Sequence, residues 1–127
     1  MAQQIKHLGM IGLGRMGGNL VRRLANAQIN TVAFDTNAKV ATDLAAENSN
    51  LIKAANSIDE LIENLPAPRA VWVMVPAGEI TENIVNELIE KLSPGDIIID
   101  GGNSYYRDDL RHNSAATSKK LNYLDVG

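Results

Sequence analysis

The sequence predicts an α/β domain in which a doubly wound parallel sheet lies between helices, in three layers. Short apolar runs alternate with segments whose apolar residues recur every three or four positions, the patterns of strands and amphipathic helices. The runs at 70–75 and 97–99 are almost wholly apolar, as in strands buried on both faces. Such strands need helical crossovers and covered faces. A length of 127 residues suits one domain of this kind.

The first half of the chain carries three of the expected strands. A strand over 5–11 leads into a helix over 15–27, a second strand over 31–35 leads into a helix over 37–47, and a short strand is expected at 51–52. In the first helix the apolar residues are spaced so that one face is turned towards the sheet. That face is predicted to comprise Met16, Leu20, Val21 and Leu24.

The second half begins with a helix that Ser57 caps, with Glu60 as its capping-box partner, and that ends before Pro66. A buried strand over 70–75, a helix over 79–92 and a second buried strand over 96–100 follow. Ser104 can cap a last helix, and a final strand is expected over 121–126.

A glycine-rich segment joins the first strand directly to the first helix, which is the context that the G-x-G-x-x-G fingerprint of Rossmann domains requires. Its glycines would allow a tight turn, close approach of a cofactor pyrophosphate and close helix packing, while the helix start favours phosphate. We therefore predict a Rossmann-type fold with its nucleotide-binding strand order. The cofactor-binding candidates here are Gly12, Leu13, Gly14, Arg15, Met16 and Gly17. The alternative is an ordinary turn whose glycines serve packing alone.

Asp35 ends the second strand, 18 residues after Gly17. An acidic residue near this position holds the adenosine ribose hydroxyls in dinucleotide-binding domains, and its charge repels a 2′-phosphate. No arginine follows, and Lys39 is the nearest cation. The sequence therefore predicts NAD in preference to NADP. Alternatively, Asp35 caps the helix that starts near Asn37, and one carboxylate could serve both roles.

Two further loops follow strands whose carboxyl ends should line the cofactor groove. One contains Val75, Pro76 and Ala77, which are further cofactor-binding candidates. The other runs from Asp100 to Ser104 and contains Asn103, whose amide can donate and accept hydrogen bonds to cofactor or substrate. The alternative for this second loop is a turn followed by a helix cap.

Residues 97–104 (IIIDGGNS) with Tyr106-Arg107-Asp108 resemble the IIDGGNS-x-YRD signature of 6-phosphogluconate dehydrogenases. The glycine-rich segment, extended through Gly18-Asn19-Leu20, resembles their N-terminal fingerprint, and the resemblance spans Met10 to Gly127. The broader β-hydroxyacid dehydrogenase family shares the first motif but usually lacks the second.

The resemblance implies oxidative decarboxylation of 6-phosphogluconate to ribulose 5-phosphate, in the pentose phosphate pathway and gluconate utilisation, with hydride passed to the nicotinamide. It also implies that Asn103 lies between cofactor and substrate, and that Val75 and Pro76 flank the cofactor. NADP-dependent members carry Asn-Arg where this chain has Asp35-Thr36, which supports NAD. Many members carry a lysine where this chain has Pro76, so one possible phosphate contact is absent.

In the family, a substrate-binding Ser-Gly-Gly loop and a helical domain with the catalytic lysine and glutamate lie beyond the position of Gly127. We therefore expect 1–127 to be the dinucleotide-binding domain of a larger, homo-oligomeric enzyme. We expect no catalytic residue in this chain and no dehydrogenase activity from it alone, because none of its lysines falls where a base would face the nicotinamide.

Composition argues against several other classes. A net charge of −3 without a basic run makes nucleic acid or an anionic membrane an unexpected partner. No apolar stretch approaches the ~18 residues of a membrane span, and no signal-peptide pattern is present, so we expect a cytoplasmic protein. With no cysteine and only His7 and His112, no metal site is expected.

Two alternatives to the 6-phosphogluconate reaction remain open. One is a β-hydroxyacid dehydrogenase or reductase that acts on a small hydroxy acid with the same fold and cofactor. The other is a non-catalytic nucleotide-sensing module, because fold by itself does not define function.

Overall fold

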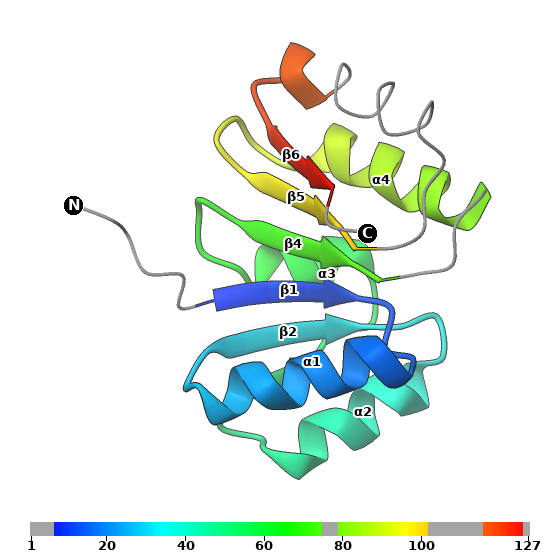
Figure 1. Ribbon diagram of the computed structural model, residues 1–127, viewed down its shortest axis with the longest axis vertical. Coiled ribbons are helices and arrows are strands. Elements are labelled where there is room, and N and C mark those ends of the chain that lie inside the picture. Colours follow the sequence, from blue (N-terminus) through cyan, green and yellow to red (C-terminus); the bar gives the residue numbers. More distant parts are fainter. Residues whose placement is uncertain (1–6, 75–78, 102–115, 126–127) are drawn as a thin grey trace.

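The computed structural model describes residues 7–74, 79–101 and 116–125, and these form one sheet with helices on both faces (Figure 1). The strands are β1 (His7–Ile11), β2 (Asn30–Phe34), β3 (Ile52–Ala54), β4 (Ala70–Val73), β5 (Ile97–Asp100) and β6 (Asn122–Asp125). The helices are α1 (Arg15–Asn26), α2 (Ala38–Glu47), α3 (Ile58–Glu63) and α4 (Glu79–Lys91). The three predicted layers are confirmed.

The strands follow the order β3-β2-β1-β4-β5-β6, and every neighbouring pair is parallel. In Figure 1 the arrows of the labelled strands point the same way, and β3 pairs parallel to β2, so the carboxyl ends share one edge of the sheet. The chain order reverses between β1 and β4, and ligands bind at such a switch point in open parallel sheets. The expected nucleotide-binding order is therefore confirmed.

The sheet separates two apolar cores. Met10 of β1 packs with α1 and α2 on one face, whereas its neighbour Ile11 packs with α3 and α4 on the other. Both side chains are almost completely buried, because successive residues of a strand point to opposite faces. This arrangement explains why β4 is apolar throughout and β5 is apolar up to Asp100.

The predicted core face of α1 is wrong at Met16, which is 72% exposed. The buried stripe of the helix instead consists of Gly17, Gly18, Val21 and Ala25, while Leu20 and Leu24 pack at its margin. Because an α-helix has 3.6 residues per turn, Met16 lies about 140° around the axis from Val21. Gly17 brings the first turn of α1 close to the backbone of Gly12, and Met16 faces outward.

Several local signals act as expected. The Ser57 hydroxyl accepts the Glu60 backbone N–H at 3.1 Å, and the Glu60 carboxylate turns back to the N–H of Asn56 at 3.3 Å. Strand β3 lies slightly later than predicted, because Ile52 to Ala54 pair in register with β2. The predicted helix from Ser104 lies outside the described residues.

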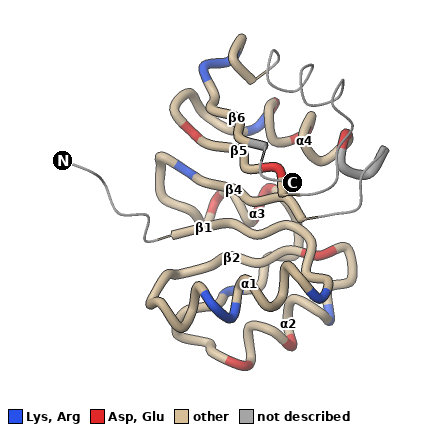
Figure 2. Tube along the Cα trace, in the orientation of Figure 1, with Lys and Arg blue, Asp and Glu red and all other residues tan. Residues whose placement is uncertain are grey.

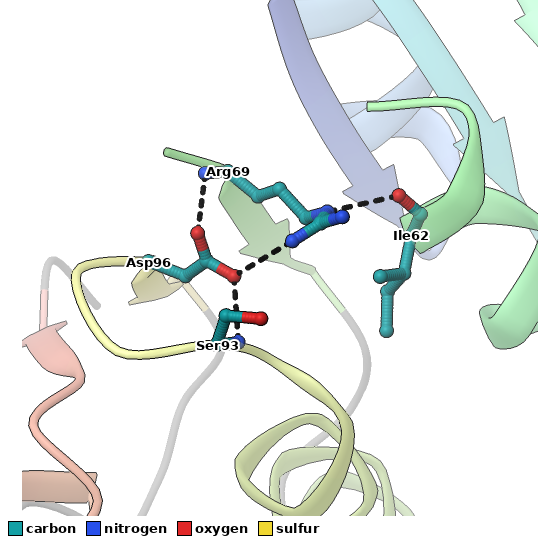
Figure 3. Close-up of polar contacts among 4 residues, drawn as sticks. All are labelled: Ile62, Arg69, Ser93 and Asp96. Carbon is teal, nitrogen blue, oxygen red and sulfur yellow. Dashed lines mark hydrogen bonds and ion pairs between the residues drawn. The ribbon is translucent and has the colours of Figure 1, made fainter. Parts of the chain in front are cut away.

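Asp96 forms a buried polar clamp at the amino edge of the sheet, and no sequence pattern indicated it (Figure 3). Its carboxylate is 1% exposed and accepts the backbone N–H groups of Arg69 at 2.7 Å and Ser93 at 2.8 Å. The Arg69 guanidinium lies 3.4 Å from the same carboxylate and donates through Nε to the carbonyl of Ile62 at 3.0 Å. The clamp thus joins the end of α3, the start of β4 and the turn before β5.

Across the described ranges, no helix is both long and apolar enough to span a membrane.

Candidate dinucleotide-binding site

The glycine-rich turn has the backbone geometry that its residues predicted. Gly12 has φ +95°, a left-handed conformation that favours glycine, and its N–H donates to the carbonyl of Phe34 at 2.9 Å. A Cβ at Gly17 would lie 2.0 Å from the Gly12 carbonyl oxygen, so only glycine fits where the helix crosses the turn. A Cβ at Gly14 would meet nothing within 4 Å, which leaves this side of the turn open to a ligand.

The start of α1 is electrostatically positive. Gly14 is its N-cap and supplies no side-chain cap, and the first turn contains no acidic residue. Helix starts normally attract capping oxygens and acidic residues, and a cation such as Arg15 is unfavourable there unless an anion binds. Arg15 and Met16 are both exposed at this end. These features fit a pyrophosphate bound at the helix N-terminus.

Asp35 joins this turn to the next strand. Its Oδ2 accepts the Leu13 N–H at 2.7 Å, and its Oδ1 accepts the Asn37 N–H at 2.9 Å. The N-cap of α2 is Asn37, whose side chain accepts the Lys39 N–H at 3.2 Å. Asp35 therefore closes the turn before the helix but does not cap it. Since each carboxylate oxygen can accept two hydrogen bonds, each keeps capacity for one hydroxyl of a diol.

The carboxyl ends of β4, β5 and β6 form the other part of this edge. Asp100 is completely buried, and the Tyr123 hydroxyl donates to its Oδ2 at 2.7 Å. The N–H of Gly101 donates to the carbonyl of Val73 at 2.9 Å. No sequence pattern indicated a role for Tyr123, because a tyrosine in a strand usually indicates packing alone.

Four of the predicted site residues lie outside the described residues: Val75, Pro76, Ala77 and Asn103. Their roles stay predictions. The structure does bring together the remaining predicted residues, since Asp35 bonds to Leu13 within the glycine-rich turn.

A pocket of about 330 Å³ between α1 and α2 adjoins the glycine-rich turn. Its lining includes Leu13 and Gly14 and the ion pair of Arg22 with Glu47, which are joined by two hydrogen bonds of 2.8 Å. These bonds hold the pKa of the Glu47 carboxyl below its ordinary value and raise the pKa of Arg22. The pair ties the two helices beside the site together.

Charges of both signs are interspersed along the described part of the chain, with basic segments at both ends of α1 (Figure 2). No group of three or more His, Cys, Asp or Glu residues within the described ranges could hold a metal ion.

An open glycine-rich turn at an uncapped helix start, with an anchored acidic residue at the end of the next strand, defines a dinucleotide-binding domain of the Rossmann type. Comparison with known proteins identifies the class more closely. The family described as the NAD binding domain of 6-phosphogluconate dehydrogenase matches residues 7–127, and the chain belongs to this family. The resemblance noted in the sequence is thereby confirmed.

Curated relatives carry the same name. The chain is 36% identical over 129 residues to the decarboxylating 6-phosphogluconate dehydrogenase of Staphylococcus aureus strain N315, covering 100% of this chain and 27% of that protein. It is 37% identical over 123 residues to the NAD(+)-dependent, decarboxylating 6-phosphogluconate dehydrogenase of Haloferax volcanii, covering 94% of this chain and 38% of that protein. The chain thus spans between about a quarter and two fifths of the length of these relatives.

Solved structures agree on the fold. The 6-phosphogluconate dehydrogenase of Plasmodium falciparum, described with its cofactor NADP+, superposes with a TM-score of 0.83 at 26% identity, covering 92% of this chain and 26% of that one. The 3-hydroxyisobutyrate dehydrogenase of Mycobacterium tuberculosis also reaches 0.83, at 23% identity, covering 96% and 40%. The second likeness shows the fold alone, whereas the family match and the curated relatives favour 6-phosphogluconate dehydrogenase.

Proposed function

We propose that this chain binds NAD for an enzyme that oxidatively decarboxylates 6-phosphogluconate to ribulose 5-phosphate. The observation that carries the cofactor proposal is the Asp35 carboxylate, anchored to the backbone of both Leu13 and Asn37 beside an open glycine-rich turn. The substrate and the reaction are supported by family membership and by the names of the relatives.

Different described residues would bind the ribose and the pyrophosphate of the adenosine half of the cofactor. Asp35 would accept the ribose hydroxyls, and the turn from Gly12 to Gly17 would hold the pyrophosphate, with the charge of Arg15 beside it. The exposed thioether of Met16 would offer an apolar contact at the same edge. When bound, the nicotinamide supplies the hydride acceptor. Val75, Pro76 and Ala77 would flank the cofactor, and Asn103 would contact cofactor and substrate.

The anchored carboxylate is our reason for preferring NAD. A 2′-phosphate beside Asp35 would bring like charges together, which costs about 4 kcal/mol at 4 Å for an effective dielectric constant of 20. Asp35 could rotate away only by giving up its bonds to Leu13 and Asn37. Lys39, the nearest cation along the chain, forms an ion pair of 3.0 Å with Asp43.

For the parent protein we propose a homo-oligomeric, cytoplasmic enzyme of the pentose phosphate pathway and gluconate utilisation, without a nucleic-acid or membrane partner. Residues 1–127 would be its dinucleotide-binding domain, and the catalytic residues would lie in another domain. The fraction of the relatives that the chain spans supports this proposal. The chain alone should not reduce NAD in the presence of 6-phosphogluconate.

Calorimetric titration of the chain with NAD and, separately, with NADP tests the cofactor proposal. We expect NAD to bind at least about ten-fold more tightly, a difference of ~1.4 kcal/mol. Equal or tighter NADP binding would refute the preference. If neither nucleotide bound, the proposal that the chain binds a dinucleotide without the rest of the enzyme would be refuted. A matched assay with NAD and 6-phosphogluconate should show no NADH formation.

A further inference from the structure

We propose that Tyr123 and Asp100 are positioning residues for the nicotinamide half of the cofactor site. Their hydrogen bond would hold the segment that leads into the loop containing Asn103. The inference rests on the proposed function, because it assumes that this loop meets the nicotinamide.

The two side chains form a short bond between neighbouring strands. Asp100 is the last residue of β5 and is completely buried, and the Tyr123 hydroxyl on β6 donates to its Oδ2 at 2.7 Å. Hydrogen bonds from a hydroxyl to a carboxylate are charge-assisted and stronger than neutral ones. The ring of Tyr123 packs against the core that α3 and α4 cover. Asp100 is therefore held from that face of the sheet.

Gly101, the next residue, is packed against side chains on the opposite face of the sheet. A Cβ at Gly101 would lie 2.3 Å from Nε1 of Trp72 and 2.4 Å from Sδ of Met74, and both of these side chains pack with the core beneath α1 and α2. The Gly101 N–H also bonds to the carbonyl of Val73 on β4. The backbone at 100–101 is thus fixed by strands on both sides and by packing on both faces.

Asp96 and Asp100 are two buried acids with different surroundings, and only Asp100 lies at the edge of the sheet where ligands bind. Both acids are buried and belong to one strand region, but they lie at opposite edges of the sheet. Asp96, at the amino edge, joins two turns and an arginine, so a structural role explains why this acid is buried. Asp100 lies at the carboxyl edge, where ligands of parallel sheets bind, and comes three residues before Asn103. Burying a carboxylate is costly unless it is hydrogen-bonded, and the Tyr123 hydroxyl supplies such a bond.

The placement of the pair also predicts which half of the cofactor depends on it. Asp35 and the glycine-rich turn lie at the ends of β1 and β2, whereas β4 separates β1 from β5. Neighbouring strands are about 4.8 Å apart, so Asp100 is about 10 Å or more from the strands of the adenosine half. Loss of the Tyr123 hydroxyl should therefore weaken contacts to the nicotinamide and leave those to adenosine diphosphate ribose unchanged.

The test compares NADH with ADP-ribose, which lacks the nicotinamide, by calorimetric titration of the chain and its Tyr123→Phe variant. We expect the Kd for NADH to rise about three- to ten-fold, the effect of one hydrogen bond, while the Kd for ADP-ribose stays within about two-fold. Thr31→Val is the matched control, because the Thr31 hydroxyl is also buried but has no hydrogen-bond partner. It should change neither Kd.

Each outcome has a distinct meaning. Equal weakening of both nucleotides by Tyr123→Phe would show a purely structural bond and overturn the inference, as would two unchanged dissociation constants. If the unchanged chain bound neither nucleotide, the proposed function itself would fail. Asp100→Asn provides a second variant, which should also weaken NADH selectively when denaturant unfolding shows that the chain is folded.

Discussion

The Asp35 carboxylate accepts the Leu13 backbone N–H at 2.7 Å, although the two residues are 22 positions apart in the chain. The bond joins the end of β2 to the glycine-rich turn after β1. Because the other carboxylate oxygen accepts the N–H of Asn37, Asp35 fixes the backbone on both sides of the proposed adenosine site. The proposed site is therefore organised by the protein's own hydrogen bonds before any cofactor binds.

Replacing Asp35 by asparagine should weaken NAD binding by about ten-fold or more and should not create tight NADP binding. The amide has one acceptor oxygen, so one of the N–H groups of Leu13 and Asn37 would face an NH₂ group. The lost bond should also lower the free energy of unfolding by about 1–3 kcal/mol. Calorimetry with both nucleotides and urea unfolding measure the two effects.

Asp43→Asn is the control for this experiment, because that exposed carboxylate pairs with Lys39 on the surface of α2. It should leave NAD affinity unchanged. Tight NADP binding by the Asp35→Asn chain would mean that charge alone determines the preference, contrary to the anchored geometry.

Two adjacent glycines of α1 should respond in opposite ways to alanine. Gly17→Ala would place a Cβ 2.0 Å from the backbone carbonyl oxygen of Gly12, a clash that only movement of the helix can relieve. We expect a loss of about 3 kcal/mol or more, as for other severe core strain, together with loss of nucleotide binding.

Gly18→Ala provides the matched comparison, since its Cβ would be 3.6 Å from the nearest atom, the Leu13 carbonyl oxygen. Alanine favours a helix over glycine by about 0.5–1 kcal/mol, so this variant should be as stable as the unchanged chain or more so. Urea unfolding of both variants measures the difference. Equal stability of the two would contradict the packing described for Gly17.

Removing the buried clamp at the amino edge should destabilise the fold without acting directly on the site. Asp96→Ala leaves two backbone N–H groups and the Arg69 guanidinium without their acceptor. Breaking a buried charge pair in this way costs about 3–5 kcal/mol. Denaturant unfolding provides the measurement. Asp59→Ala is the control, because that carboxylate is 65% exposed in its pair with Lys91 and should contribute less than about 1 kcal/mol.

The pair of Arg22 and Glu47 predicts a specific pH dependence. Hydrogen bonding to Arg22 holds the pKa of the folded Glu47 carboxyl below its ordinary value of 4.5. A lowered pKa in the folded state means that the stabilisation is fully present above the unfolded pKa and is lost as the pH falls through the folded pKa. The urea midpoint of the unchanged chain should therefore exceed that of Glu47→Gln at neutral pH, and the difference should shrink as the pH falls below the ordinary pKa of 4.5 and through the lowered pKa of the folded state.

Salt provides the internal check for this exposed pair. A concentration of about 1 M shortens the screening length to about 3 Å, so the difference near neutral pH should shrink there as well. A difference that persisted in acid would show that Glu47 acts through packing and not through its charge.

Much of the architecture could be predicted from local patterns. The apolar runs at 70–75 and 97–99 correspond to central strands β4 and β5, and Ser57 caps α3 as expected. These predictions held because strand burial and helix capping depend on residues close together in the chain. The prediction for Met16 was wrong, since the spacing of apolar residues cannot show that Gly17 packs α1 against the backbone of Gly12 on another side of the helix.

The sequence by itself determined the fold class, the glycine-rich turn and the acidic residue at the end of β2, because these follow from residue type and spacing. It left open whether Asp35 serves the ribose or the helix start. Only the tertiary structure decided that the same carboxylate bonds to Leu13 and Asn37, that Asp96 joins two turns, and that Tyr123 meets Asp100. Each of these relationships depends on which strands become neighbours, and the pairing of distant segments is a property of the whole sheet that no local pattern contains.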